Sequence, residues 1–384
     1  MEINNMTANR LNNVKEYYFS SKLREVASLI KIGKPIINMG IGSPDLFPPK
    51  AVISSLLESV NDSKAHQYQS YQGIPELRQE ISNFYKSHYR VTLNSENEVL
   101  PLIGSKEGIM HISMAFLNPG DQVLIPNPGY PTYSAVTNLL EAKSILYELD
   151  EINGWLPNLK LLERLDLSKV KIMWVNYPHM PTGTEASDIF FDELISFAKK
   201  NKILIVNDNP YSFILTKSPK SFLSHKGALE VGMELNSLSK SFNMSGWRVG
   251  MLIGNSINIK SVLKVKSNMD SGMFYGIQKG AVRALGLNRK WFNDLNKVYR
   301  ERREIAWKIA GKLNTVYDKN AVGLFVWAKI PDSLESSDIL IDELLYKKNI
   351  FITPGKIFGS QGDRYIRISL CLEKSKLKEA LNRL

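Results

Sequence analysis

A lysine set among hydroxyl side chains is the first feature of this sequence that could do covalent chemistry. Lys240 lies between Ser239 and Ser241, with Ser237 three positions before it and Arg248 eight positions after it. A lysine amine forms imines with aldehydes and can then move a proton as a general acid or base. Hydroxyl groups and the forked guanidinium of arginine are typical phosphate ligands. This segment therefore fits an aldehyde cofactor that carries a phosphate, although a lysine in an exposed serine-rich loop would look the same.

An aspartate at the end of an apolar run narrows the choice of cofactor. Asp208 closes such a run, where an unpaired carboxylate would be costly. Pyridoxal 5′-phosphate (PLP) is an aldehyde that withdraws electrons best when a carboxylate keeps its pyridine nitrogen protonated. Tyr211 follows three residues later and could donate a hydrogen bond to the phenolic oxygen of that ring. These residues predict a PLP site, and the alternative for Asp208 is a helix N-cap before Pro210.

Four further residues could complete such a site, and each has an ordinary structural alternative. Ser105 and Lys106 begin a predicted helix whose backbone N–H groups could bind phosphate, but a Gly-Ser turn before a helix is common. Tyr130 could stack on a planar ring or simply follow a Pro-Gly turn. Arg367 could bind a substrate carboxylate or lie on the surface face of a strand.

Alternating strands and helices predict how these residues are brought together. Apolar runs at 122–125, 171–175, 203–206, 233–235 and 251–253, with a helical pattern over 189–197, indicate a mainly parallel sheet between helices. Ligands of such sheets bind beyond the carboxyl ends of the strands. The segments that follow the first four runs contain Tyr130, Met180, Asp208 and Lys240. We therefore expect one shared site at that edge.

The 384 residues are enough for a large domain and a smaller one. We expect residues 1–47 to form an N-terminal arm and part of the small domain, with a short helix from Tyr17 to Leu29. Residues 48–275 would form the large PLP-binding domain and 276–384 the small α+β domain. In the latter, Tyr365–Ser369 alternates like a strand that carries Arg367 on its polar face.

Composition argues against several other classes of protein. The net charge is +11, but Lys and Arg are scattered among acids, which favours a solvated basic surface over nucleic-acid binding. The five histidines lack metal-ligand spacing, and no apolar run approaches the ~20 residues of a membrane span. The start of the chain is polar, and the single Cys371 excludes an internal disulfide. We expect a cytoplasmic protein with no metal, nucleic-acid or membrane partner.

Taken in order, these motifs resemble the fold-type I PLP enzymes of the class I/II aminotransferase superfamily. SLSKSFNMSGWRVG at Ser237–Gly250 is the most specific, and IGSPD, GSKEG, NPGYP, PTG, DNPY and RYIRISL support it over nearly the whole length. LIGSKEGI and PNPGYPTY most resemble the LL-diaminopimelate aminotransferase and alanine transaminase branch. The resemblance implies an α/β fold with a mainly parallel, seven-stranded type of sheet and a smaller α+β domain.

The resemblance also implies roles for single residues around the cofactor. Lys240 would form the Schiff base, Asp208 would pair with the pyridinium nitrogen, and Tyr211 would bond the phenolic oxygen. The residues expected around the phosphate are Ser105, Lys106, Ser237, Ser239 and Arg248.

Four other positions would contact the ring, the substrate or a second subunit. Tyr130 would stack on the ring, while Gly42 and Arg367 would meet the substrate carboxylate. Tyr68 matches a tyrosine that reaches into the neighbouring subunit's site, which implies a homodimer with shared active sites.

One position departs from the family pattern. Met180, in PHMPTG, stands where an asparagine usually donates to the phenolic oxygen. Methionine cannot make that bond, so we expect a weaker hold on the phenolate and a raised imine pKa compared with asparagine-bearing relatives. His179 could supply a donor instead, or Met180 could pack on the ring.

The leading function is the transfer of an amino group from an amino acid to a 2-oxo acid. The resemblance favours LL-diaminopimelate or a small neutral amino acid as donor and 2-oxoglutarate or pyruvate as acceptor. A PLP-dependent C–S β-lyase would use the same residues and stays open. A non-catalytic PLP-binding regulator is disfavoured, because only about forty residues precede Gly42. Spacing does not decide which of Lys266, Asn268 and Arg283 would bind the substrate side chain.

Overall fold

A seven-stranded sheet organises most of the chain in the computed structural model, which describes residues 7–14, 16 and 18–384. The strands are β2 (Val99–Leu102), β3 (Gln122–Asn127), β4 (Lys143–Glu148), β5 (Val170–Val175), β6 (Leu204–Asp208), β7 (Gly232–Ser237) and β8 (Gly250–Gly254). Their order across the sheet is β2-β8-β7-β6-β5-β3-β4. Only β8 among them runs against its neighbours, so the mainly parallel sheet is confirmed.

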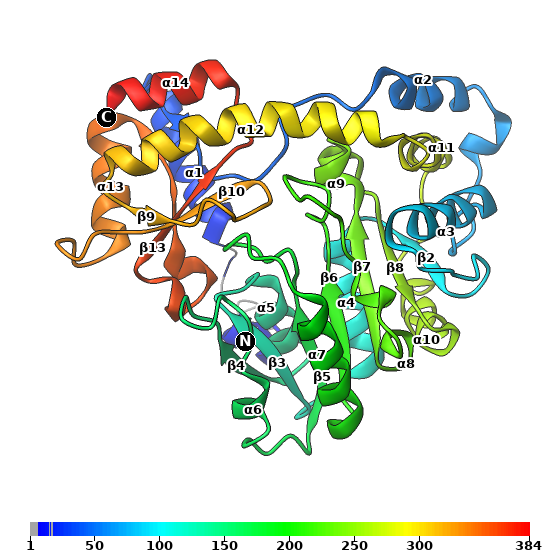
Figure 1. Ribbon diagram of the computed structural model, residues 1–384. Helices are drawn as coiled ribbons and strands as arrows, with labels where there is room; N and C mark the ends of the chain where they lie inside the picture. The colour runs from blue at the N-terminus through cyan, green and yellow to red at the C-terminus, as the bar shows by residue number, and fades with distance from the viewer. Residues whose placement is uncertain (1–6, 15, 17) are drawn as a thin grey trace, which may run out of the picture.

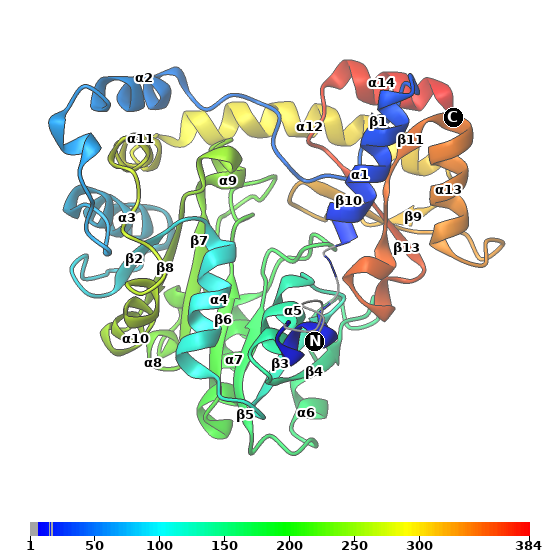
Figure 2. The same ribbon diagram turned by 180° about the vertical axis from the view of Figure 1, so that it is seen from behind.

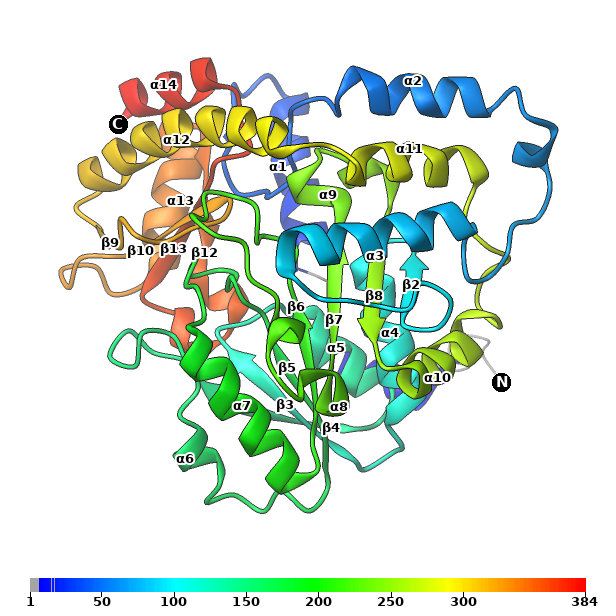
Figure 3. The same ribbon diagram turned by 45° about the vertical axis from the view of Figure 1, so that its right-hand side comes forward.

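Helices cover both faces of this sheet, which is why its strands are apolar on both sides. One face packs against α4 (Ser105–Phe116), α5 (Thr132–Leu139) and α10 (Ser256–Lys266), as Figure 2 shows. The other face packs against α3 (Pro75–Tyr89), α7 (Asp188–Asn201) and α11 (Tyr275–Leu285), and α2 (Lys50–Ser59) lies against α11 (Figure 3). The shorter helices α6 (Leu159–Leu162), α8 (Ala228–Val231) and α9 (Leu238–Ser241) join the strands. None of the helices in the described part of the chain is long and apolar enough to cross a membrane.

A second, smaller domain is built on two short sheets. One contains β9 (Val316–Tyr317), β10 (Phe325–Lys329), β12 (Thr353–Pro354) and β13 (Tyr365–Ser369) in the antiparallel order β12-β13-β10-β9. The other pairs β1 (Ile37–Asn38) with β11 (Ile350–Phe351) in parallel. The helices are α1 (Tyr18–Lys31), α13 (Ser337–Lys348) and α14 (Lys374–Arg383). The first residue of the expected helix in the arm, Tyr17, lies outside the described residues.

The long helix α12 (Arg289–Lys312) connects the two domains along the top of Figure 1. Its Phe292 belongs to the core beneath the large sheet, whereas Ile305 and Ile309 belong to the core of the small domain. The expected boundary at residue 276 falls inside α11, which packs on α2 and α3 of the large domain. We therefore propose that the small domain begins within α12, and that the segment around β1 belongs to it because β1 pairs with β11.

Candidate active site

A pocket of about 330 Å³ lies at the carboxyl edge of the large sheet, where the sequence predicts a site. The predicted site residues that line it are Gly42, Ser105, Lys106, Tyr130, Met180, Asp208, Tyr211, Ser237, Ser239, Lys240, Arg248 and Arg367. These residues come together because β3, β5, β6 and β7 are parallel, so their carboxyl ends meet at one edge. Tyr68 does not line the pocket of its own chain, and its side chain is 91% exposed.

Lys240 enters this pocket from α9, directly after β7. Its Nζ donates a hydrogen bond of 2.6 Å to the carbonyl oxygen of Gly42. A Cβ atom at Gly42 would lie 2.2 Å from the Phe325 ring, so only glycine fits at this position. Burial lowers the pKa of Lys240, and the nearby Arg367 and Arg248 lower it further, although Cys371 and Asp208 oppose them. The amine is thereby biased toward its neutral, nucleophilic form.

Asp208 presents one bonded and one unbonded carboxylate oxygen. Oδ2 accepts a 2.9 Å hydrogen bond from the Tyr133 hydroxyl, while the buried Oδ1 has no hydrogen-bond partner among the described residues. Burial raises the pKa of Asp208 to about 6; the charge of Glu234 also raises it, whereas Tyr133 and Lys240 lower it. No helix starts at Asp208, so the alternative of an N-cap is not what the structure shows. A buried acceptor at a pocket wall fits a protonated pyridine nitrogen.

Behind Asp208, a second carboxylate fixes the end of β6. Glu234 of β7 is fully buried and faces Asn207 in the adjacent strand. It accepts hydrogen bonds from the side chains of Tyr85 (2.9 Å), Asn207 (2.9 Å), Asn209 (3.3 Å) and Ser221 (2.8 Å) and from the N–H of Phe222 (3.0 Å). Because both residues that flank Asp208 are bonded to Glu234, this carboxylate holds the Asp208 backbone in place. The motifs did not reveal Glu234.

Replacing Glu234 with glutamine should destabilise the fold by about 3 kcal/mol, because the new NH₂ group would face donors instead of accepting from them. The measurement is chemical unfolding of the cofactor-free protein, with Glu193→Gln on the exposed face of α7 as the matched control. If both variants unfolded at the same denaturant concentration as the wild type, the network would contribute no stability.

Beside Arg248, which lines the pocket, there is no room for a side chain at position 104. The guanidinium of Arg248 lies over Gly104, where a Cβ atom would be 2.2 Å from its Nη2. Gly104 also has a φ of +90°, which L-residues with side chains rarely adopt. The Ser237 hydroxyl accepts a 3.1 Å hydrogen bond from the N–H of Ser239. Serine hydroxyls, a guanidinium and the start of α4 therefore surround one small volume, which fits a phosphate.

Arg367 is buried, in contrast to the expectation that it lies on a polar strand face. Its side chain is 5% exposed, and its guanidinium carbon lies 3.9 Å from the ring centre of Phe325 and 4.7 Å from that of Phe358. Nη2 donates to the carbonyl oxygen of Gly40 at 2.8 Å. All of β13 is buried, so one face of this strand forms a wall of the pocket and the other face packs in the core. Neither face is exposed to solvent. A cation that lies over two aromatic rings in a pocket is well placed for a carboxylate.

Met180 contacts this arginine. Its sulfur lies 3.3 Å from Nη1 of Arg367, and its side chain lines the pocket. His179 lies outside the pocket lining, and its Nδ1 is 2.8 Å from the Thr182 hydroxyl, so the structure does not favour it as the missing donor. Asn176, which the motif analysis passed over, lines the pocket but uses its amide on backbone: it donates to the carbonyl of Asp208 and accepts from the N–H of Met180.

Introducing the family's asparagine in Met180→Asn should lower the pKa of the cofactor imine relative to the wild type, because an amide N–H can stabilise the phenolate and a thioether cannot. Absorbance titration of the two holoproteins measures this pKa directly. An equal or lower imine pKa in the wild type would contradict the expectation, and Met114→Asn on the exposed part of α4 serves as the control for a polar substitution elsewhere.

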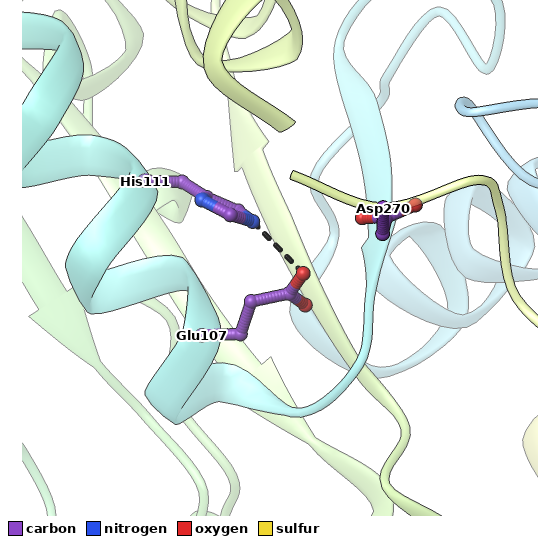
Figure 4. A group of neighbouring side chains, drawn as sticks. All are labelled: Glu107, His111 and Asp270. Atoms are coloured by element: carbon purple, nitrogen blue, oxygen red, sulfur yellow. Dashed lines mark hydrogen bonds and ion pairs between the residues drawn. The ribbon is translucent and has the colours of Figure 1, made fainter. Parts of the chain in front are cut away.

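Figure 4 shows a carboxylate–histidine cluster near the pocket that resembles a metal site. Ligand atoms of Glu107, His111 and Asp270 lie within 4.8 Å of one another. Nζ of Lys266, which is 1% exposed, lies 2.7 Å and 2.8 Å from the two carboxylate oxygens of Asp270. The Lys266 ammonium therefore supplies positive charge to the cluster, and an ion-pair network explains the arrangement of these side chains.

The structure also bears on three residues considered as anchors for the substrate side chain. Lys266, Asn268 and Arg283 do not line the pocket of their own chain, and Lys266 is paired with Asp270. Other residues that line the pocket include Leu23, Ile41, Ser43, Phe325 and Phe358. Ile41 and Ser43 belong to the IGSPD motif, whereas Leu23, Phe325 and Phe358 lie outside every motif.

Comparison with known proteins agrees with the fold. The family model for aminotransferase class I and II matches residues 34–384. The LL-diaminopimelate aminotransferase of Natranaerobius thermophilus is 40% identical over 381 residues, 98% of each chain. That of Halothermothrix orenii is 38% identical over 379 residues, 98% of this chain and 97% of that enzyme.

Solved structures show the same likeness. Substrate-bound BacF from Bacillus subtilis has a TM-score of 0.94 at 35% identity and covers 100% of this chain and 97% of its own. An aromatic aminotransferase from Pyrococcus horikoshii has a TM-score of 0.86 at 26% identity, covering 93% of this chain and 97% of its own.

The fold and the matches together define an enzyme of the PLP-dependent aminotransferase class with a fold-type I architecture. The chain belongs to the class I and II aminotransferase family, and its similarity to LL-diaminopimelate aminotransferases confirms the branch that its motifs resemble.

Proposed function

We propose that this aminotransferase uses Lys240 to hold the cofactor and to move the α-proton of its substrate. The observation that best supports this proposal is that Lys240 and Asp208, whose Oδ1 has no hydrogen-bond partner among the described residues, line the same pocket. When bound, PLP supplies the electron sink that amino transfer requires. Asp208 would keep the pyridine nitrogen protonated, Tyr211 would bond the phenolic oxygen, and Tyr130 would cover the ring. Arg367 and the backbone at Gly42 would orient the substrate carboxylate so that its α-proton faces the Lys240 amine.

We propose LL-diaminopimelate or a small neutral amino acid as the donor and 2-oxoglutarate or pyruvate as the acceptor. The supporting finding is the similarity to LL-diaminopimelate aminotransferases over 98% of the chain. A panel of amino donors with 2-oxoglutarate, followed by glutamate formation, tests this assignment. Rapid pyruvate release from cystathionine without any 2-oxo acid would instead favour the C–S β-lyase.

The proposal includes a cytoplasmic homodimer in which Tyr68 enters the partner's site. A side chain of this size that is 91% exposed is consistent with a contact to a second subunit. When Lys240→Ala and Tyr68→Ala subunits are mixed and reassembled, the heterodimer should contain one intact site. We expect about a quarter of the wild-type activity from random pairing, although each variant alone is nearly inactive. A mixture no more active than its two components would refute the shared site.

A further inference from the structure

A second cavity in the structure is larger than the active-site pocket. Its volume is about 790 Å³, and it shares no lining residue with that pocket. Four distant parts of the chain form its walls: the end of α3 with the residue after it, the start of α7, residues 213–225, and the start of α12. The catalytic role proposed above uses none of these residues.

Positive charge gathers around this cavity. The lining contains four permanently or normally charged cations, which are Arg90, Lys217, Lys220 and Arg289. Its one carboxylate, Asp188, is 2.8 Å from Lys220, and Glu185 lies close enough to Lys217 and Lys220 for their charges to act on it. The net charge around the cavity is therefore positive, and a concave basic surface concentrates anions.

The backbone and the cavity floor add to this arrangement. Arg90 follows α3 with a φ of +61°, a left-handed conformation that favours glycine or asparagine and costs an arginine about 1 kcal/mol. The floor is aromatic: Phe213 and Phe292 are stacked with ring centres 4.4 Å apart, and His88 meets both edge-on. Burial lowers the pKa of His88, and Arg289 lowers it further, which favours the neutral imidazole.

The cavity wall is bonded to the same network that holds Asp208. The amide of Asn209 donates both to the carbonyl of Lys220 at 2.9 Å and to Glu234 at 3.3 Å. Ser221, also in the wall, donates to Glu234 at 2.8 Å. Tyr211 lines the active site and Phe213, two residues later, lines the cavity. An occupant would therefore rest on the segment that carries the cofactor-binding aspartate.

We propose that this cavity is a second ligand site, which binds a small polyanion through Arg90, Lys217 and Arg289. Forked guanidinium groups from two separate segments of the lining suit phosphate or carboxylate oxygens. The occupant is a soluble metabolite with two or more negative charges, either phosphorylated or a polycarboxylate.

Calorimetric titration of the holoenzyme with inorganic pyrophosphate and, separately, with citrate tests the proposal and distinguishes the two chemistries. Sodium chloride keeps the ionic strength constant, so general charge screening does not contribute. The holoenzyme is used because its cofactor already fills the phosphate end of the active site. We expect one of the probes to bind with a dissociation constant of about 1 mM or lower.

Two triple variants separate a site from a basic surface. Arg90→Gln, Lys217→Gln and Arg289→Gln together should weaken binding at least about tenfold. The control carries the same charge change at exposed lysines elsewhere, Lys34→Gln, Lys171→Gln and Lys378→Gln, and should bind like the wild type. Absence of binding by the wild type, or equal loss in both triple variants, would overturn the proposal. The single variant Arg289→Gln should give an intermediate affinity, which guards against a folding defect in the triple variant.

Discussion

Lys240→Ala is expected to lower amino transfer at least about 10⁴-fold, because it removes both the amine that holds the cofactor and the group that moves the α-proton. Its Nζ lies 2.6 Å from the carbonyl oxygen of Gly42, within the pocket that contains Asp208 and Arg367. The alanine side chain leaves the lining otherwise intact, so the loss should appear in kcat far more than in the stability of the protein.

A chemical readout separates this role from mere structural support. Borohydride reduction followed by denaturation should leave the cofactor attached to the wild-type chain and not to Lys240→Ala. Lys264→Ala, at an exposed lysine of α10, is the control and should behave like the wild type in both assays. Covalent cofactor on the Lys240→Ala chain would overturn the assignment.

Asp208→Asn is expected to lower activity about 100-fold or more and, at the same time, to stabilise the cofactor-free protein. The activity falls because an amide cannot keep a pyridine nitrogen protonated. The stability rises because the introduced amide carries no charge in this buried position, and its oxygen could still accept from Tyr133. A buried charge that serves catalysis should show this combination, in which its removal lowers the activity and raises the stability of the protein.

The pH dependence of the stability effect follows from the raised pKa. Burial moves the pKa of Asp208 from its ordinary value of 3.8 to about 6, so the folded protein binds this proton more tightly than the unfolded chain. The resulting stability is fully present below about pH 4 and is lost as the pH rises through about 6. Asp208→Asn should therefore match the wild type below about pH 4 and exceed it by up to about 3 kcal/mol above about pH 6.

Urea unfolding of the two apoproteins at several pH values measures this difference. Asp342→Asn, at an exposed position of α13, is the matched control for an aspartate-to-asparagine substitution. A constant difference between Asp208→Asn and wild type across about pH 4 to 6 would show that Asp208 does not titrate in that range.

The sequence was sufficient for five of the seven strands of the large sheet and for most of the pocket, because the relevant signals are local. It did not reveal β2 and β4, which lie at the two edges of the sheet. Each buried parallel strand is a short apolar run, and parallel strands place their carboxyl ends at one edge. Tyr130, Met180, Asp208 and Lys240 could therefore be grouped before any contact was known. PLP chemistry requires a lysine amine and a carboxylate, and Lys240 and Asp208 supply both in the same pocket. The types of these residues and their order along the chain were therefore enough to predict the class of enzyme.

Only the tertiary structure decided the environment of the buried polar groups. The alternation of residue types in Tyr365–Ser369 could not show whether Arg367 faces solvent or a pocket, because an arginine is tolerated in either environment. The two aromatic rings that Arg367 contacts belong to other parts of the chain, so the sequence of this strand did not reveal them. Glu234 stands in an otherwise apolar strand, and its partner Tyr85 is 149 positions distant. A buried charge is stable only through such partners, and they are fixed by packing between elements and not by neighbours in sequence. The same holds for the second cavity, whose cations come from three separate segments.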